Sequence, residues 1–273
     1  MTTAVLTHSP ARTDHRARWS VAAGQIFRRW SVNTMREAWG VGVSLLQPVI
    51  WILLFGQVFT SIGTIPGFGS DGYITFLVPG ILMMTVLYSG AWAGTGYIED
   101  IDNGVMDQLL TAPVRRSALV AGQLAQQLVV GLLQSAIVLV IGFAGGARYP
   151  GGVGGVGLAL VAATLLAAAF CSLSTAVALT TRSHLALIGI AQMVVLPVTF
   201  LSTAMMPRDL MPGWVQAVSR YNPMTWSVEI ARTGLAGTAN WGEIAWQLSL
   251  LTALATAAFA WSIAAFNSYR RAL

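Results

Sequence analysis

The run LLQPVIWILLFGQVF occupies residues 45–59 and contains no charged side chain. It forms the centre of an apolar stretch that extends over residues 41–62. A helix of about 20 apolar residues, rising about 1.5 Å per residue, is long enough to cross the hydrocarbon core of a bilayer. The stretch therefore predicts a membrane-spanning helix.

Five further stretches pass the same test, and in chain order they are residues 73–97, 118–145, 155–181, 185–206 and 243–267. A chain with 55% hydrophobic and 9% charged residues has too few charges to cover a water-facing surface, since soluble domains carry about a quarter charged residues. We predict an all-α integral membrane protein with six transmembrane helices within residues 39–273. An N-terminal interfacial amphipathic helix and short extracellular helices between spans five and six complete the predicted fold.

The N-terminal segment differs from the spans. Residues 1–18 are polar and predict a disordered cytoplasmic tail. Over residues 19–38, apolar side chains recur at helical spacing and arginines fall mostly on the other side; the apolar set is Trp19, Ala23, Ile26 and Trp30. This pattern is typical of a helix that lies in the headgroup plane of a membrane. An irregular tail that precedes the first span is the alternative.

The basic residues predict the orientation, and all 15 of them are arginine. With the N-terminus in the cytoplasm, eleven arginines lie on the cytoplasmic side and four on the other, in agreement with the positive-inside rule. Six spans then return the C-terminus to the cytoplasm. The net charge of +5 is better explained by basic flanks facing anionic lipid than by binding of nucleic acid.

The composition also excludes several chemistries. Without lysine, the chain cannot build the phosphate-binding loop of a Walker-type ATPase. The single cysteine, Cys171, rules out an internal disulfide and a cysteine-based metal cluster. No Ser/His/Asp or metal-binding constellation converges from the predicted spans, so we expect no catalytic residues, no metal and no enzyme activity in this chain.

The loop over residues 98–116 carries the densest acidic cluster in the chain, formed by Glu99, Asp100, Asp102 and Asp107. Val105, Leu109 and Leu110 add an apolar edge, and Pro113 can end a short helix. A short helix with an apolar edge and flanking charges is suited to docking a soluble partner. A solvated turn between two spans is the alternative.

A second segment that does not span the membrane covers residues 204–236. Asn222 can cap a helix whose first residue is Pro223 and which runs to about Leu235. Trp214 belongs to a second short amphipathic piece, and tryptophan favours the membrane interface. We predict two short helices that lie at the outer leaflet or dip into it. Residues 229 and 232, a glutamate and an arginine, could pair on one helical face in a structural or a gating role.

These two segments, together with the order of the spans, resemble the permease subunit of type-2 ABC exporters, the ABC-2 family. Within that family, the branch that includes daunorubicin-resistance-type drug exporters is the most similar. The resemblance covers about residues 20–270. It is carried by the run from Glu99 to Pro113-Val114-Arg115-Arg116 and by the motif Met206-Pro207…Pro212-Gly213-Trp214…Asn222-Pro223…Glu229…Arg232.

The resemblance implies the partners and the site. It implies a bacterial cytoplasmic (inner) membrane, a second permease subunit as homodimer or heterodimer, and two copies of a separate ABC ATPase. ATP and Mg would bind to that ATPase and no cofactor to this chain. The residues implied in coupling to the ATPase are Glu99, Asp100, Asp107, Leu109, Leu110, Pro113, Arg115, Arg28 and Arg29. Those implied in an extracellular gate are Pro207, Trp214, Asn222, Pro223, Glu229 and Arg232.

In such an exporter, cargo is expected to leave between the two permeases, along spans one, two and five. Candidate lining residues are Trp51, Phe55 and Phe59 of span one and Leu196, Pro197 and Phe200 of span five. A path of this kind suits an amphipathic drug, lipid or glycoconjugate. Ordinary helix packing is the alternative at each of these positions.

Two other functions stay open at this point. An ion-coupled secondary transporter usually keeps a carboxylate or histidine at membrane depth. Here Glu243 only opens the last span, and the three histidines lie in tails or a turn. A non-transporting membrane scaffold would use the same docking segments. The identity of the cargo does not follow from the sequence.

Overall fold

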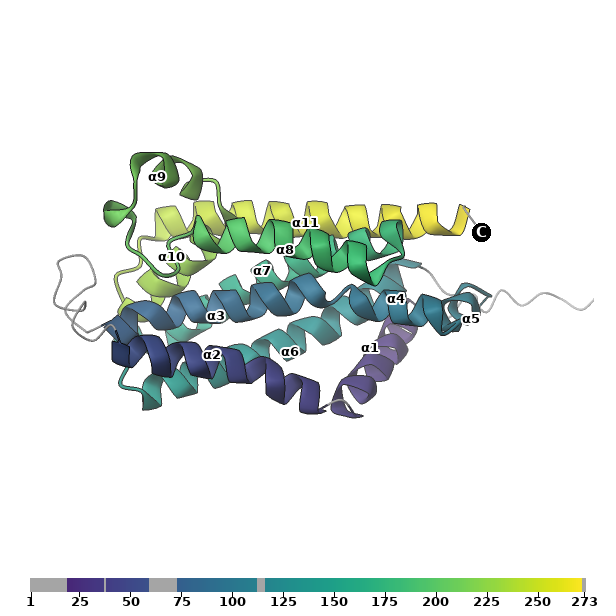
Figure 1. Cartoon of the computed structure of the whole chain (residues 1–273), viewed down its shortest axis with the longest axis horizontal. Helices are drawn as coiled ribbons and strands as arrows, with labels where there is room; N and C mark the ends of the chain where they lie inside the picture. The colour runs from purple at the N-terminus through teal and green to yellow at the C-terminus, as the bar shows by residue number, and fades with distance from the viewer. Residues whose placement is uncertain (1–18, 37, 59–72, 112–115, 272–273) are drawn as a thin grey trace, which may run out of the picture.

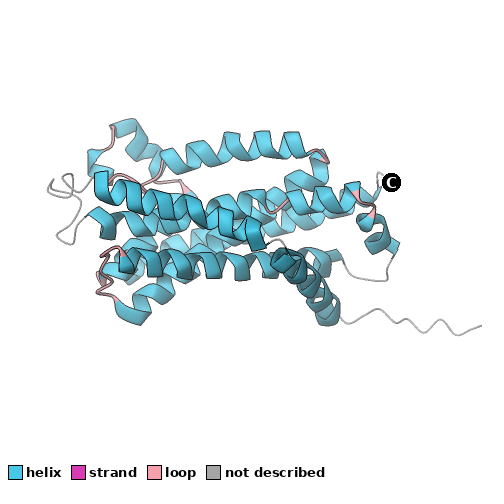
Figure 2. Cartoon of the chain, turned by 60° about the horizontal axis from the view of Figure 1, so that its bottom comes forward, coloured by secondary structure: helices cyan, strands magenta, loops and turns pink. Residues whose placement is uncertain are grey.

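The computed structural model describes residues 19–36, 38–58, 73–111 and 116–271, and every regular element in this part of the chain is helical (Figure 2). The elements are α1 (Trp19–Arg36), α2 (Ala38–Val58), α3 (Tyr73–Trp92), α4 (Thr95–Asp102), α5 (Val105–Thr111), α6 (Arg116–Ala144), α7 (Gly152–Thr181), α8 (His184–Phe200), η2 (Arg208–Leu210), α9 (Gly213–Ser219), α10 (Pro223–Ala236) and α11 (Trp241–Arg271). The all-helical prediction is confirmed for these residues.

The helices form an elongated bundle with two different ends (Figure 1). One end carries α1, α4, α5 and the C-terminal part of α11, and the other carries α9 and α10. Four helices within the described residues are long and apolar enough to cross a membrane: Tyr73–Asp102, Ser117–Ala144, Gly152–Thr181 and Trp241–Tyr269. The helix His184–Phe200 is apolar but shorter. The chain is therefore a multi-pass membrane protein, and four of the six predicted spans meet the length and hydropathy expected of a spanning helix within the described residues.

The predicted segments outside these spans are present as helices. The N-terminal helix covers Trp19–Arg36, but its apolar face packs on α6 rather than standing apart from the bundle. Ala22 and Ile26 are buried there, whereas Trp19 is exposed and donates a hydrogen bond to Ser117 Oγ at 3.0 Å. Contact with the headgroup plane stays a prediction. The predicted tail over residues 1–18 lies outside the described residues.

The helix α7 forms the centre of the bundle and packs against α3, α10 and α11. Its small residues, among them the buried Ala159, Ala162 and Ala163, allow neighbouring helices to approach closely. The closest approach joins α7 to α10. A Cβ atom at Gly155 would lie 2.1 Å from the Gly234 carbonyl oxygen, so glycine is required at this position.

The first long span is broken near residue 93, and polar groups from other helices repair the break. The Gly94 amide donates to Ser174 Oγ at 3.0 Å, and the Ser174 hydroxyl donates to the Ala91 carbonyl at 2.6 Å. Gln123 Nε2 donates to the Ala93 carbonyl at 2.9 Å. A helix break in an apolar environment is tolerated when neighbouring side chains satisfy the freed backbone groups in this way.

The turn between α7 and α8 is as short as the sequence predicts. Arg182 ends α7 in the left-handed conformation, with φ of 51°, and its guanidinium lies 4.5 Å from the centre of the Tyr269 ring. Ser183 caps α8 by accepting a hydrogen bond from the Ala186 amide. These local contacts bring α7 and α8 together as adjacent helices.

The contact between α7 and α10 gives a test of the fold. Gly155→Ala places a methyl group against the Gly234 carbonyl, and overpacking of this kind typically costs about 1–3 kcal/mol. We expect a lower midpoint of thermal unfolding for the purified Gly155→Ala variant in detergent. Gly157→Ala is the matched control, because its Cβ meets no atom within 4 Å and alanine favours a helix. Equal unfolding midpoints for the two variants would contradict the predicted packing.

Candidate functional site

The N-terminal helix is fixed to the bundle by an ion pair. Arg29 of α1 donates to the Asp100 carboxylate of α4, across 71 residues of sequence. The Asp100 side chain is 10% exposed and that of Arg29 is 37% exposed. Both residues were predicted to couple to an ATPase, and the structure instead engages them with each other. They hold α1 on α4, so any contribution to coupling would pass through this pair.

Aromatic packing strengthens the same junction. The Trp30 ring lies against Gly96, where a Cβ atom would come within 2.4 Å of the indole. The rings of Trp30 and Tyr97 are 6.0 Å apart between centroids. Ile26 joins a buried cluster with Met106 of α5 and Phe266 of α11. Side chains of α1, α5 and α11 therefore meet in one buried cluster.

The remaining acidic residues of this end face outward. Glu99, Asp102 and Asp107 are exposed. Asp102 Oδ2 lies 3.7 Å from His184 Nε2. Leu109 is half-buried and packs on the cluster of Ile26 and Met106, so it does not form the outward apolar edge that the sequence predicted. The exposed acids and the exposed Arg28 are thus among the described side chains at this end that could face a partner.

Several predicted site residues lie outside the described part of the structure. Pro113, Arg115 and Phe59 belong to this group, as do the side chains of Leu110 and Phe55. Their predicted roles stay predictions.

The other end of the bundle is built around a helix start that the sequence predicted. Asn222 Oδ1 accepts a hydrogen bond from the Met224 amide, and Pro223 is the first residue of α10. The Asn222 amide also donates to the carbonyls of Val198 and Leu201, at 2.7 and 3.1 Å. This buried side chain therefore ties α10 to the end of α8. Of the other predicted gate residues, Pro207 is buried just before η2, whereas Trp214 of α9 is 66% exposed.

Arg232 makes a different contact from the predicted pair with Glu229. Its guanidinium lies 3.8 Å from the centre of the Phe76 ring and donates to the Thr203 carbonyl at 2.9 Å. Glu229 instead accepts a hydrogen bond from Gln247 Nε2 at 2.8 Å. Burial raises the pKa of the Glu229 carboxyl, and the positive charges of Arg208 and Arg232 oppose that rise. Arg232 therefore joins α10 to α3 and to the segment after α8.

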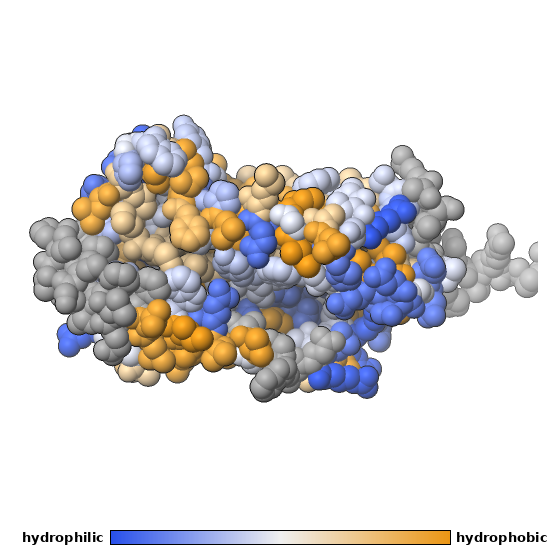
Figure 3. Space-filling view, viewed as in Figure 1, coloured by the Kyte–Doolittle hydropathy of each residue, from blue (hydrophilic) through white to orange (hydrophobic). Residues whose placement is uncertain are grey.

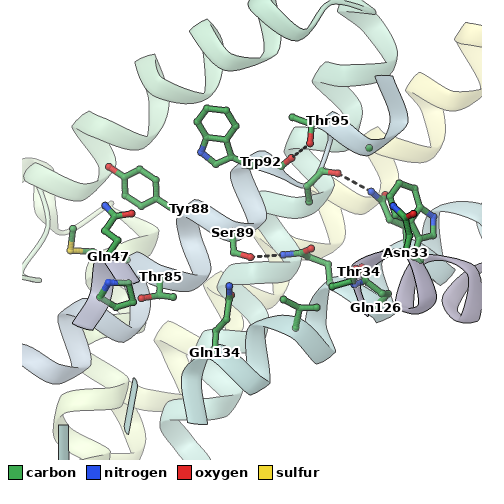
Figure 4. Close-up of a pocket in the computed structure, with 18 of the residues that line it drawn as sticks. Asn33, Thr34, Gln47, Thr85, Tyr88, Ser89, Trp92, Thr95, Gln126 and Gln134 are labelled. Carbon is green, nitrogen blue, oxygen red and sulfur yellow. Dashed lines mark hydrogen bonds between the residues drawn. The ribbon is translucent and has the colours of Figure 1, made fainter. Parts of the chain in front are cut away.

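A cavity of about 420 Å³ lies among α1, α2, α3, α4 and α6. Figure 3 shows it as a hollow between α2 and α3, and its lining combines polar with apolar and aromatic side chains. Its lining includes the glutamines Gln47, Gln123, Gln126, Gln127 and Gln134 and the aromatic residues Trp30, Trp51, Tyr88 and Trp92 (Figure 4). A cavity of this size falls in the range of small-molecule sites, about 300–1,000 Å³.

The residues predicted to line a cargo path lie on α2 and α8. Trp51 of α2 faces the cavity. Leu196, Pro197 and Phe200 of α8 are exposed on the bundle surface and do not line it. A path between two copies of the chain stays a prediction.

Sequence reasoning missed the glutamines, although a signal was present. Residues 123, 126, 127 and 134 share one face of α6 because they are separated by three, four and eleven residues. Uncharged amides do not interrupt an apolar span in a count of charges, so the helix was read as apolar throughout. A search for polar residues at helical spacing would have found this face.

Comparisons with known proteins agree with the fold. The sequence model of the ABC-2 type transporter family matches residues 22–236. The daunorubicin resistance ABC transporter permease protein DrrB1 of Streptomyces coeruleorubidus is 27% identical over 200 residues, which cover 73% of this chain and 70% of that protein. The putative transport permease ycf38 of Cyanophora paradoxa is 29% identical over 189 residues, covering 69% and 65% of the two chains. The inner membrane transport permease YadH of Escherichia coli K12 is 28% identical over 207 residues, covering 71% and 76%.

Because the family model covers most of the chain, this protein belongs to the ABC-2 type transporter family. The relatives are permeases, so the chain is a transport subunit rather than an enzyme. The resemblance drawn from residues 99–116 and 206–232 is confirmed at the level of the family, including a relative concerned with drug resistance.

The ion pair between α1 and α4 can be tested by removing one partner. Arg29→Ala leaves the Asp100 carboxylate buried without its guanidinium, which typically costs about 1–3 kcal/mol or more for a charged group. We expect the thermal unfolding midpoint of the purified protein to fall. Arg28→Ala removes an exposed arginine from the same helix and should leave the midpoint unchanged. A fall of equal size in both variants would rule out a specific role for the pair.

The role of Arg232 at the other end can be measured by limited proteolysis. Arg232→Met removes the donor to the Thr203 carbonyl and the charge beside the Phe76 ring. We expect faster cleavage within residues 201–212, because this segment loses its contact with α10. Arg220→Met removes an exposed arginine and serves as the control. Unchanged cleavage of Arg232→Met would show that other contacts hold the segment.

Proposed function

We propose that this chain is the transmembrane permease of an ATP-binding-cassette exporter, driven by a separate ATPase subunit. Membership of the ABC-2 family supports transport. The arrangement of the α1 end supports the proposal of a separate ATPase. Exposed acidic side chains lie on α4 and α5, and these short helices pack on the core through Met106 and Tyr97. A force applied to α5 would reach α1 and α11 through this cluster.

The proposed orientation places this end in the cytoplasm. Most arginines of the chain then lie on the cytoplasmic side, as the positive-inside rule favours. The helices α9 and α10 would lie on the extracellular side and act there as a gate. In this arrangement α2 and α8 supply the two spans beyond the four long apolar helices, and the chain crosses a bacterial inner membrane six times with both termini inside.

A second permease subunit is proposed to cover α8. Leu185, Met193 and Phe200 are 83%, 80% and 66% exposed on this helix. Their spacing places them on nearby positions of one helical stripe. An extended apolar stripe suits packing against another span, and Leu196, Pro197 and Phe200 would then contribute to a path between two copies.

The decisive test is association with an ATPase. We expect the chain, co-expressed with candidate ABC ATPases, to co-purify with one of them and to support ATP hydrolysis in nanodiscs. The double variant Glu99→Gln with Asp107→Asn should weaken the complex by about 2- to 30-fold, because exposed ion pairs contribute roughly 0.2–1 kcal/mol each. Asp100 and Leu109 were also predicted to couple to the ATPase, but they are not substituted here because Asp100 is buried and Leu109 is half-buried.

The matched control is Asp209→Asn, which removes an exposed carboxylate from η2 at the other end of the bundle. It should bind the ATPase like the unaltered chain. Failure to co-purify with any ATPase would overturn the exporter proposal. Equal weakening by the control and the double variant would overturn the assignment of the coupling surface.

A further inference from the structure

The glutamines that face the cavity are held in place by other helices. Gln126 Nε2 donates to Thr34 Oγ1 of α1 at 2.8 Å, and Gln127 Nε2 donates to Ser89 Oγ of α3 at 2.7 Å (Figure 4). Burial of an amide in an apolar region without a partner is costly. These bonds offset that cost and fix the orientation of both side chains before any ligand arrives.

The same bonds leave acceptors for a ligand. Each of them uses an amide N–H as the donor, so the carbonyl oxygen of the half-buried Gln127 can accept a hydrogen bond from a molecule in the cavity. Gln47 lies exposed on the α2 wall and presents both a donor and an acceptor. The α6 glutamines extend over eleven residues, or about 16 Å of helix axis at about 1.5 Å per residue. Within this row Gln127 is half-buried, whereas Gln123, Gln126 and Gln134 are buried, so Gln127 is the α6 glutamine open to a ligand.

Aromatic side chains form the other part of the lining. Trp51 projects from α2, and Tyr88 and Trp92 from α3. An aromatic ring offers a flat apolar face together with a polar edge in tyrosine and tryptophan. Flat faces beside amides match a ring that carries hydroxyl groups at its edge and C–H groups on its faces.

The charge of the lining selects against ionic ligands. Among the described side chains around the cavity, Glu99 is the only charged one, and it lies at the α4 end. A phosphate would be met by arginine or lysine, which pair with it strongly. A metal cation would require several oxygen ligands with negative charge. The cavity therefore favours a neutral group that forms many hydrogen bonds.

The two sides of α2 differ in polarity, so a ligand at this wall could combine a polar group with an apolar one. Gln47 and Trp51 face the cavity, whereas Leu46, Ile50 and Leu53 are 56%, 49% and 56% exposed on the outer side of the same helix. The hollow, with its row of glutamines, thus borders an apolar surface (Figure 3). A molecule with a polar head and an apolar tail could place the head in the cavity and the tail along α2.

From this arrangement we infer that the cavity binds the neutral, polyhydroxylated headgroup of an amphiphile, such as a glycosyl group on a lipid. The inference rests on the proposed export function and names the class of cargo. Gln47 and Gln127 bind the hydroxyl groups, and Trp51 packs against the face of the sugar ring. The cavity holds the headgroup at the α1 end of the bundle, beside the helices proposed to receive the force of the ATPase.

The test measures ligand binding to the full chain in nanodiscs, without an ATPase. Three probes share one tail and differ in the head: hexyl β-glucoside, hexylphosphocholine and hexyltrimethylammonium; free glucose is the fourth arm. Binding is followed by the intrinsic fluorescence of the chain, to which the cavity residues Trp30, Trp51 and Trp92 contribute, and by the thermal unfolding midpoint, which rises when a ligand binds the folded state. We expect a saturable response to hexyl β-glucoside and a weaker response to the other three.

Two variants locate the site. Gln47→Leu changes an exposed side chain and leaves the hydrogen bonds between helices in place. The double variant Gln47→Leu, Gln127→Leu removes two groups that could bind ligand hydroxyls. The double variant should weaken glucoside binding about tenfold, equivalent to about 1.4 kcal/mol. Gln47→Leu alone should show a smaller loss, which keeps the test valid if the double variant folds poorly. Gln192→Leu on α8, outside the cavity, is the matched control and should bind normally.

Each contrary result is distinct. Equal binding of the three hexyl compounds would show recognition of the tail, and tighter binding of the phosphocholine or ammonium probe would show an aromatic site for a cation. Free glucose that binds as tightly as its hexyl derivative would exclude the amphiphile. Normal binding by the Gln47→Leu, Gln127→Leu variant would place the ligand elsewhere. Each of these overturns the inference, whereas the exporter proposal falls only if no ATPase associates.

Discussion

A polar group that enters the apolar interior of this protein has to find its partner within the chain, because lipid offers none. The break between α3 and α4 shows how this constraint shapes the fold. Ser174 and Gln123 bind the backbone groups at Gly94 and Ala93 that the break releases. Gln126 and Gln127 meet hydroxyl groups on α1 and α3. The polar ties therefore decide which helices lie together, while small residues on α7 decide how closely they approach.

The two ends of the bundle apply the same rule in different ways. At the α1 end, the Arg29 and Asp100 charges neutralise each other and leave the outward acids free to face water or a partner. At the α10 end, Asn222 and Arg232 donate to backbone carbonyls of the segment that follows α8. An irregular segment is thereby held in place among spanning helices. The α1 end is suited to receiving the force of the proposed ATPase. The α10 end is suited to holding or releasing the segment that follows α8.

The proposed binding cavity would connect this architecture to transport. Its polar lining comes largely from side chains that first serve to join helices, so ligand contacts and helix contacts share the same residues. A shift of α1 against α6 would alter the position of Gln126 through Thr34. The cluster around Met106 and Phe266 links α1 to α5 and α11. Movement at the proposed coupling helices would therefore change the shape of the cavity without a separate transmission element.

Local sequence patterns were sufficient to predict many of the helices and their ends. The cap of α10 by Asn222 before Pro223 and the cap of α8 by Ser183 are contacts between neighbouring residues, and membership of the ABC-2 family could be inferred from motifs in the sequence. The contacts between helices could not. Helical periodicity shows which residues share a face, but it does not show which face of another helix meets it. The sequence by itself therefore determined the helical class and the family, whereas only the tertiary structure decided that Asp100 is buried by Arg29, that Arg232 lies on Phe76, and that the amides of α2 and α6 surround one cavity.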